Sequence, residues 1–476
     1  MDTKALRQKI LDLAIHGKLV SQDPNDEPAS VLLERIRAEK ERLIKEGKIK
    51  KGKKSAKTSD KPHYPYELPK GWVWCKLDDI AYVASGSTPE KSSFVPKGIP
   101  YIKMYNLRNQ KIDFEYKPQY VTAEIHNGKL QRSRTEVGDL IMNIVGPPLG
   151  KLAIIPPSLP QANFNQAAVL IRPYLHKDNI NVYLKAYLEE MSEINSISTK
   201  GSAGQVNISL TQSQNMRIPL PPLPEIERII KNLKYWLSFV DNIEENKEKL
   251  QDSIRQVKSK VLDLAIHGKL VPQDPNDESA IELLKRINPK AEITCDNPQY
   301  GKLPKGWCET LLGNIGNWQS GATPSRLRKD YYNGDIPWLK TGDLNDSVIK
   351  SIPETITRKA LEETSVKLNP TGSVLIAMYG ATIGKIGILA LPATTNQACC
   401  ACVDYMCDKM FLFYFLLANR KRFIAMGGGG AQPNISKEKI TNTHIPLPPL
   451  SEQHRIVAKI EELFVHFDKI ESSLQA

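Results

Sequence analysis

The sequence predicts a mixed α/β protein: two pseudo-symmetric α/β domains separated by two long antiparallel helices that form a coiled-coil spacer. Three observations predict this fold. The segment LDLAIHGKLV-QDPNDE occurs at 11–27 and again at 262–278, and the copies differ only at Ser21 and Pro272. A series of shorter segments follows each copy in the same order. Apolar residues recur at helical spacing before the second copy and at the C-terminus, so a duplicated unit is indicated.

The composition is that of a globular protein, because 41% of the 476 residues are hydrophobic and 25% are charged. The N-terminus begins with a helical pattern rather than a secretory signal. The longest apolar run, Met410–Leu417, is much shorter than the roughly 20 residues that a membrane span requires. We therefore expect a cytoplasmic protein that does not contact membranes.

The seven cysteines do not indicate a disulfide framework, because their number is odd. Cys399, Cys400, Cys402 and Cys407 lie close together but lack the paired C-x2-C spacing of metal sites. The repeat aligns NQACCAC with NQAAVLI at 165–171. We therefore predict buried strand cysteines, which pack as small apolar side chains, and neither a metal nor a cofactor.

The net charge of +12 is concentrated in one segment. Residues 35–61 contain twelve Lys and Arg against four Asp and Glu, a net charge of +8. Within it, EGKIKKGKKSAKTSDK at 46–61 is typical of a solvated, flexible linker. It is also suited to holding nucleic-acid phosphates without sequence preference. The two interpretations are compatible, and the charge alone does not identify a nucleic-acid-binding protein.

Residues 1–61 are predicted to form a helical region followed by this basic linker. Apolar residues recur at three- and four-residue intervals from Leu6 to Leu13. Gly17 is suited to end the helix in a left-handed conformation, and Gly268 takes the same place in the second copy.

Residues 62–218 and 298–445 are predicted to be two related mixed α/β domains. Short apolar runs alternate with Gly and Pro turns, which is typical of strands. The shared segments are ELPKGW and KLPKGW, SGSTP and SGATP, IPYIK and IPWLK, GQVNIS and AQPNIS, and IPLPPL in both. The sequence between these segments differs strongly, which indicates a constant framework with variable loops.

Residues 219–297 are predicted to contain one helix from Glu225 to about Ile266, roughly 60 Å long. Its apolar residues keep a heptad-like spacing with one phase break between Val240 and Ile243. The predicted stripe consists of Ile230, Leu233, Leu237, Val240, Ile243, Leu250, Ile254, Val257, Val261 and Leu264.

Residues 446–476 are predicted to form a second helix of this kind, with apolar residues from Ile456 to Leu474. Because an apolar stripe must be buried, we expect this helix to pair antiparallel with the central one. The N-terminal and C-terminal helical segments together correspond to the continuous central helix, so we also expect the two ends of the chain to pack together. A coiled coil between two separate chains is the alternative.

No motif indicates a catalytic centre. GATIGKIG at 380–387 has three residues between its glycines where a Walker A motif has four, and Ile386 replaces the Ser or Thr. We predict a strand–turn–strand there. GGGG at 427–430 matches GSAG at 201–204 and is predicted to be a loop before a helix, which Ser209 caps in the first repeat. Zinc-protease, serine-hydrolase and adenine-methylase motifs are not found, so we predict that the chain is not an enzyme.

The repeated LDLAIHGKLVPQDPND, the paired LPKGW, SGxTP, NQA, QxNIS and IPLPPL segments and their cyclic order resemble the specificity (S) subunit of type I restriction–modification systems, over essentially the whole chain. The resemblance implies that 62–218 and 298–445 are target recognition domains, each reading half of a bipartite site in double-stranded DNA. It implies helical spacers that dock two methyltransferase (M) subunits, and restriction/translocase (R) subunits that complete the complex. Methylation of adenine N6 with S-adenosylmethionine and ATP-dependent cleavage would belong to these partners.

Polar residues on the loops between the framework segments are the candidates for DNA contact, because sequence is read by side chains that reach base edges. We expect base contacts after IPYI and IPWL and in the QxNIS segments, and phosphate contacts from the lysine of each GK turn. The candidates are Lys103, Asn106, Arg108, Lys151, Gln205, Asn207, Lys340, Thr341, Asp343, Lys385, Gln432 and Asn434. For each of them a turn-forming or solvated role is the alternative.

Two other functions fit parts of the sequence. A stand-alone DNA-modifying enzyme would use unfamiliar motifs, and a coiled-coil adaptor would need no DNA. Half-sites about one DNA turn apart, roughly 34–36 Å, require fixed spacing. A rigid helix between two different domains meets that requirement, so the sequence favours a DNA-reading subunit.

Overall fold

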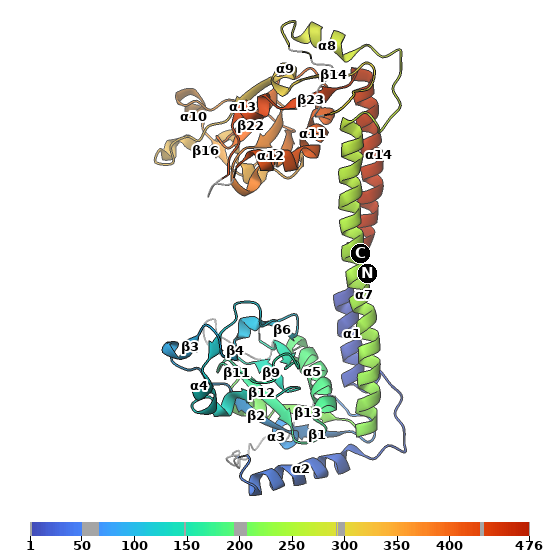
Figure 1. The fold of residues 1–476 in the computed structure, drawn as a ribbon, viewed down its shortest axis with the longest axis vertical. Helices are drawn as coiled ribbons and strands as arrows, with labels where there is room; N and C mark the ends of the chain where they lie inside the picture. The colour runs from blue at the N-terminus through green and yellow to red at the C-terminus, as the bar shows by residue number, and fades with distance from the viewer. Residues whose placement is uncertain are drawn as a thin grey trace. The chain divides into compact units, whose positions relative to one another are not determined.

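The chain divides into two compact units, Asp2–Asn246 and Lys247–Ala476, here called the N-terminal and the C-terminal unit. Helix α7 (Leu223–Ile266) begins in the first and ends in the second (Figure 1). Among the described helices, none is both long and apolar enough to cross a membrane. The computed structural model describes residues 2–49, 66–146, 149–194, 207–291, 293, 300–428 and 433–475.

The core of the N-terminal unit is a four-stranded antiparallel sheet in the order β10-β9-β12-β2. A five-stranded sheet in the order β3-β7-β4-β11-β8 and the pairs β1–β13 and β5–β6 complete its strands. The strands are β1 (Val73–Lys76), β2 (Ala81–Ser85), β3 (Phe94–Val95), β4 (Ile99–Ile102), β5 (Leu107–Arg108), β6 (Lys111–Ile112), β7 (Tyr120–Val121), β8 (Arg134–Thr135), β9 (Leu140–Asn143), β10 (Leu152–Ile154), β11 (Ala162–Phe164), β12 (Ala168–Pro173) and β13 (Arg217–Leu220).

The long helix of this domain, α5 (Lys177–Ile194), packs against β12, β10 and α1. It buries apolar residues at three- and four-residue intervals, among them Ile180, Tyr183 and Tyr187. The other helices of the unit are α1 (Thr3–Ile15), α2 (Ala29–Lys45), α3 (Leu77–Ile80), α4 (Ala123–Asn127) and α6 (Leu210–Gln214).

The C-terminal unit has a five-stranded sheet in the order β15-β22-β19-β20-β17, a three-stranded sheet in the order β18-β16-β21 and the pair β14–β23. The strands are β14 (Cys308–Leu311), β15 (Asn317–Ser320), β16 (Tyr332–Leu339), β17 (Ser347–Ile349), β18 (Thr355–Ile356), β19 (Val374–Ala377), β20 (Ile386–Leu389), β21 (Thr394–Thr395), β22 (Cys399–Val403) and β23 (His444–Leu447). The helices are α8 (Ala280–Ile287), α9 (Leu312–Ile315), α10 (Arg358–Glu363), α11 (Lys409–Ala418), α12 (Arg420–Met426), α13 (Lys437–Thr441) and α14 (Leu450–Gln475).

The two units share one topology. The antiparallel run β2-β12-β9-β10 corresponds to β15-β22-β19-β20. The parallel pair β4–β11 corresponds to β16–β21, and the pair β1–β13 to β14–β23. The predicted fold, two related mixed α/β domains with a long helix between them, is confirmed. The finer boundaries at 61/62, 218/219, 297/298 and 445/446 stay predictions.

The glycine of each SGxTP segment has a steric role. A Cβ on Gly86 would lie 2.0 Å from the carbonyl oxygen of Asn165, and a Cβ on Gly321 would lie 2.2 Å from that of Thr395. Only glycine allows so close a backbone approach. This contact explains why SGxTP and the NQA region recur together.

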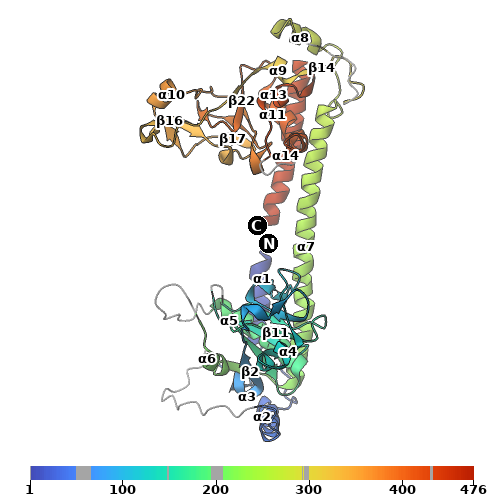
Figure 2. The ribbon, with the colours of Figure 1, turned by 60° about the vertical axis from the view of Figure 1, so that its left-hand side comes forward.

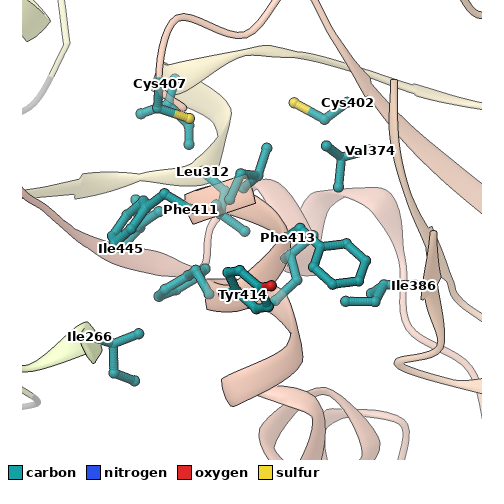
Figure 3. Close-up of a cluster of buried hydrophobic side chains, with 14 of the residues drawn as sticks. Ile266, Leu312, Val374, Ile386, Cys402, Cys407, Phe411, Phe413, Tyr414 and Ile445 are labelled. Carbon is teal, nitrogen blue, oxygen red and sulfur yellow. The ribbon is translucent and has the colours of Figure 1, made fainter. Parts of the chain in front are cut away.

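The clustered cysteines are buried, as predicted. Cys399, Cys400 and Cys402 lie in β22, and Cys407 precedes α11. Figure 3 shows Cys402 and Cys407 among apolar side chains of the C-terminal core, Phe411 among them. Burial raises the pKa of Cys400 and Cys407 to about 12, so these thiols stay protonated and unreactive at neutral pH.

Each unit contributes its own helix to the spacer. In the N-terminal unit α1 runs antiparallel beside α7, and Arg7 of α1 pairs with Asp241 at 2.5 Å (Figure 1). In the C-terminal unit α14 runs antiparallel beside α7, and Lys258 of α7 pairs with Asp468 at 2.7 Å. Antiparallel pairing within each unit is therefore confirmed. A contact between the two ends of the chain, and the alternative pairing between chains, stay predictions.

The predicted apolar stripe of α7 is only partly buried. Val240, Ile254 and Val261 are buried, but Leu250 and Val257 are 41% and 44% exposed. The prediction was wrong for these two residues. Heptad spacing cannot distinguish a seam covered on both flanks from one covered by a single helix. In the C-terminal unit α14 covers the face of α7 that carries Val261.

The first part of the basic run at 35–61 is helical, and it lies before the segment 46–61 for which a flexible linker is predicted. Residues 35–45 belong to α2, which buries Leu32 and Ile36. Arg37 pairs with Asp79 at 3.0 Å, and Lys40 pairs with Asp78 at 2.7 Å, so α3 neutralises part of the positive charge. Residues 50–61 lie outside the described part of the chain.

The repeated segments meet at a junction that each unit builds in the same way. In the N-terminal unit the Trp72 indole N–H and the Gln22 amide donate to the buried Glu225 carboxylate at 3.0 and 3.2 Å. In the C-terminal unit Trp307 and Gln273 donate to Glu452 at 3.0 and 3.1 Å. We call these two sites the Trp–Glu junctions. Each links the IHGK…QDP segment, LPKGW and the start of a long helix.

Neighbouring contacts reinforce each Trp–Glu junction. Arg228 pairs with Asp26 at 2.5 Å, as Arg455 pairs with Asp277 at 2.7 Å. Gly17 and Gly268 have φ of 63° and 64°, as predicted for residues that end helices, and a Cβ there would lie within 2.6 Å of Pro69 or 2.4 Å of Pro304. Burial raises the pKa of both junction carboxyls, Glu225 and Glu452, above the ordinary 4.5.

Removing the indole N–H should destabilise one unit at a time. Trp72→Phe leaves a buried carboxylate oxygen without its donor, at a cost of about 1–3 kcal/mol in the free energy of unfolding of the N-terminal unit. Trp307→Phe should do the same in the C-terminal unit. Urea unfolding followed by circular dichroism measures both. Trp236→Phe, at an exposed residue of α7, is the control, and equal midpoints for all three variants would contradict the prediction.

Candidate nucleic-acid interface

The first candidate loop has the same local structure in both units. Lys103 follows β4 directly, and its backbone N–H donates to Asn106 Oδ1 at 2.9 Å. Lys340 follows β16, and its backbone N–H donates to Asp343 Oδ2 at 2.9 Å. A short 3₁₀ turn lies between the lysine and its capping residue in each case, and in the C-terminal unit it begins at the half-buried Thr341.

Asn106 is held inside the protein. Its side chain is 1% exposed, and its Nδ2 donates to the carbonyl oxygens of Asp113 and Tyr116 at 3.1 and 2.8 Å. Since both ends of the amide are used, Asn106 shapes the loop and has no group left for a base edge. The turn-forming alternative therefore fits Asn106 better than DNA contact. Asp343 caps its turn in the same way but is half-buried.

Arg108 is the most accessible candidate on this loop of the N-terminal unit. Its guanidinium stacks 4.3 Å from the ring centre of Tyr116, and its Nε lies 3.6 Å from Asp113 Oδ2. The Lys103 ammonium lies 5.2 Å from the ring centre of Phe94. Aromatic rings thus orient the charged groups of both side chains.

The second candidate loop is the GK turn. Lys151 follows the turn between β9 and β10, and Lys385 follows the turn between β19 and β20. Their backbones are fixed: Lys151 N–H donates to Asn143 Oδ1 at 3.0 Å, and Lys385 N–H donates to the Thr382 carbonyl at 2.9 Å. The strand–turn–strand prediction for 380–387 is therefore confirmed.

The third candidate segment crosses the end of the GK hairpin. Asn207 forms a β-bridge with Val145, and Asn434 forms one with Tyr379. Both asparagines are exposed. They precede α6 and α13, which Ser209 and Ser436 cap. Gln205 and Gln432 lie outside the described residues.

Side chains that the sequence did not single out join the first and second loops. The Leu152 N–H donates to Gln110 Oε1 at 2.7 Å in the N-terminal unit. The Ile386 N–H donates to Asp346 Oδ1 at 3.1 Å in the C-terminal unit, where Arg420 pairs with Asp346 and donates to the Gly384 carbonyl at 2.9 Å. Gln110 and Asp346 both have positive φ, 55° and 61°. All three candidate loops therefore adjoin in each unit.

These observations define a class of protein: two variable polar surfaces presented on one duplicated framework. The chain matches the family model described as type I restriction modification DNA specificity domain over residues 69–252 and 304–476, and it belongs to this family.

Relatives of known role support the assignment. The chain is 28% identical over 567 aligned positions to the type I restriction enzyme EcoEI specificity subunit of Escherichia coli, covering 99% of this chain and 91% of that protein. It is 28% identical to the EcoAI specificity subunit of Escherichia coli, covering 98% and 90%. A solved chain described under complex assembly and conformational transition of the type I R-M system has a TM-score of 0.56 at 19% identity, covers 86% of this chain and 94% of that one, and shows the same fold.

The chain is therefore a type I restriction–modification specificity subunit with two DNA-recognition domains. Specificity subunits are the non-catalytic members of these systems, which confirms that the chain is not itself an enzyme. The resemblance drawn from the repeated segments is confirmed as well.

Neighbouring residues of the first loop should respond differently to substitution. Asn106→Ala should lower the free energy of unfolding of the N-terminal unit by about 1–3 kcal/mol, because buried backbone groups lose their partners. Arg108→Ala should leave stability unchanged and weaken binding to the specific DNA site by roughly 5- to 150-fold, the value of one base contact. Urea unfolding and fluorescence anisotropy measure the two effects. A destabilised Arg108→Ala protein, or one that binds its site normally, would refute this division of roles.

Proposed function

We propose that the two units read the two halves of a bipartite site in double-stranded DNA. The observation that carries this proposal is the recurrence of the same three adjoining loops in both units. The loops share Lys103 and Lys340, Lys151 and Lys385, and Asn207 and Asn434, while the residues around these positions differ. A constant framework fixes the backbone, and the variable side chains supply donors and acceptors for base edges. The proposed contacts are Lys103, Arg108, Lys151, Gln205, Asn207, Lys340, Thr341, Asp343, Lys385, Gln432 and Asn434.

We propose two kinds of contact for these residues, one with phosphates and one with base edges. Lys151 and Lys385 follow backbone turns, where a point charge suits a phosphate and carries no sequence information. Arg108, Asn207 and Asn434 present planar groups that can form paired hydrogen bonds with base edges. Asn106 is left out of the contact set because it is buried.

We also propose that α7 sets the gap between the half-sites. A single helix of 44 residues supports this role, because its length is about 66 Å at 1.5 Å per residue. The rival adaptor function would give no reason for two sets of variable polar loops. A stand-alone enzyme would conflict with the family to which the chain belongs.

Lengthening α7 by one turn near Lys247 tests the DNA-reading function. Four added residues extend the helix by about 6 Å, or one to two base pairs. We expect adenine methylation in the host genome at a bipartite motif, its loss on deletion of the gene, and a longer gap with unchanged half-sites for the lengthened protein. Long-read methylation mapping measures all three. An undivided motif, or methylation that persists without the gene, would exclude the proposal.

We propose that two methyltransferase (M) subunits and the restriction/translocase (R) subunits assemble on this chain in the cytoplasm. Exposed apolar residues on the spacer helices support such docking. Tyr235, Trp236 and Phe239 of α7 are 55%, 45% and 46% exposed, and their rings contact one another. Exposed aromatic clusters of this kind mark protein interfaces.

Trimming this aromatic cluster should weaken assembly. Trp236→Ala is expected to reduce co-purification of the methyltransferase subunit by about tenfold or more, since buried tryptophans dominate interface energies. Trp236→Phe should retain most of the binding and serves as the control. Titration of tagged subunits followed by size-exclusion chromatography measures the effect. Equal assembly by both variants would place the docking surface elsewhere.

A further inference from the structure

One apolar side chain of the C-terminal unit stands almost entirely in solvent. Leu327 is 94% exposed, whereas the other exposed large apolar side chains of the described residues range from 36% to 55%. It lies in a β-turn closed by the Arg328 N–H, which donates to the Ser325 carbonyl at 3.1 Å. Leu327 is thus the tip of a tight turn.

The first arm of this turn is braced by aromatic rings. The Arg326 guanidinium lies 4.5 Å from the ring centre of Tyr332 and 5.0 Å from that of Trp338. The Trp338 indole N–H donates to the Ala322 carbonyl at 3.1 Å, and the Tyr332 hydroxyl donates to the Pro324 carbonyl. The chain that enters the turn is therefore held at two points.

The second arm is braced by charge. The Arg328 guanidinium stacks 4.4 Å from the ring centre of Tyr331 and donates to both carboxylate oxygens of Asp330 at 2.9 and 2.7 Å. Lys359 pairs with Asp330 at 2.9 Å. Hydrogen bonds from Arg328 and Lys359 hold the pKa of Asp330 well below its usual range, so the carboxylate stays charged.

The Leu327 side chain is the group of this turn that remains for a binding partner. Both arginines already have carboxylate partners, since Arg326 also bonds Glu354 at 3.1 Å. A turn whose backbone is already held loses little conformational freedom when its tip meets an apolar surface, so such a contact can gain affinity.

The turn adjoins the proposed DNA-reading loops. Glu354 accepts from both Arg326 and Lys340, so one carboxylate links the Leu327 turn to the loop after β16. Figures 1 and 2 show β16 and α10 on the side of the C-terminal unit that lies away from α14. The Leu327 turn is therefore linked through Glu354 to the first candidate loop of this unit.

We propose that Leu327 contacts the apolar surface of a base in the half-site that the C-terminal unit reads. This inference rests on the proposed DNA-reading function. Duplex DNA offers two such surfaces: the C5 methyl group of thymine in the major groove, and the face of a base where a base step opens.

The N-terminal unit has no equivalent residue in the corresponding segment. There Pro89 is followed by Glu90 and Lys91, and Glu90 pairs with Lys129 at 2.7 Å. After SGxTP the N-terminal unit therefore offers polar side chains, whereas the C-terminal unit offers an apolar one. An apolar base contact would belong to one half-site only.

Leu327→Ala tests the inference in the full-length chain assembled with its methyltransferase subunits. We expect the variant to keep its fold and to lose about fivefold or more in affinity for the specific site, the lower range for one lost base contact. The slope of log affinity against log salt should not change, because no phosphate contact is removed. Leu368→Ala, at another exposed leucine of this unit, should bind as the wild type does.

Modified DNA distinguishes the two apolar surfaces. If Leu327 contacts a thymine methyl, replacing that thymine by uracil should weaken the wild type but not Leu327→Ala. If it enters a base step, 2-aminopurine at that step should brighten with the wild type and not with the variant. An unchanged affinity of Leu327→Ala, or a loss of affinity without either response, overturns the inference alone. A wild type with no sequence preference overturns the DNA-reading function as well.

Discussion

A buried carboxylate at the start of each long helix holds three distant chain segments together. Glu225 accepts from Trp72 of LPKGW and from Gln22 of the QDP segment, and Glu452 does the same in the second unit. A buried charge is costly unless it is fully hydrogen-bonded. No member of the junction can change alone without leaving that charge unsatisfied, so these segments repeat almost unaltered while the loops between them diverge.

The junction also couples each recognition domain to its helix. Trp72 lies directly before β1, Glu225 lies just after β13, and β1 pairs with β13. The domain is thus fixed to α7 by residues that lie outside the candidate loops. Loop residues can therefore change without disturbing how the domain is attached.

The repeat made much of this fold predictable, and what it could not predict has physical reasons. Aligning the halves identified the buried cysteines, because Cys400 lies in the core of the C-terminal unit as Val169 lies in the core of the N-terminal unit. Periodicity did not reveal that Leu250 is exposed, since it reports spacing and not what covers a face. Nor did loop position show that Asn106 is buried, because a turn-forming and a DNA-reading asparagine look alike in sequence.

The same loop geometry is held by different chemistry in the two units. A neutral amide, Gln110, joins the first two loops in one, and the ion pair of Asp346 with Arg420 joins them in the other. The Asp346–Arg420 ion pair places formal charges beside the C-terminal loops, whereas Gln110 places none beside the N-terminal ones. Divergence between the halves therefore extends beneath the exposed surface. Each unit keeps the backbone path, and its own supporting residues set the charge environment of its candidate loops.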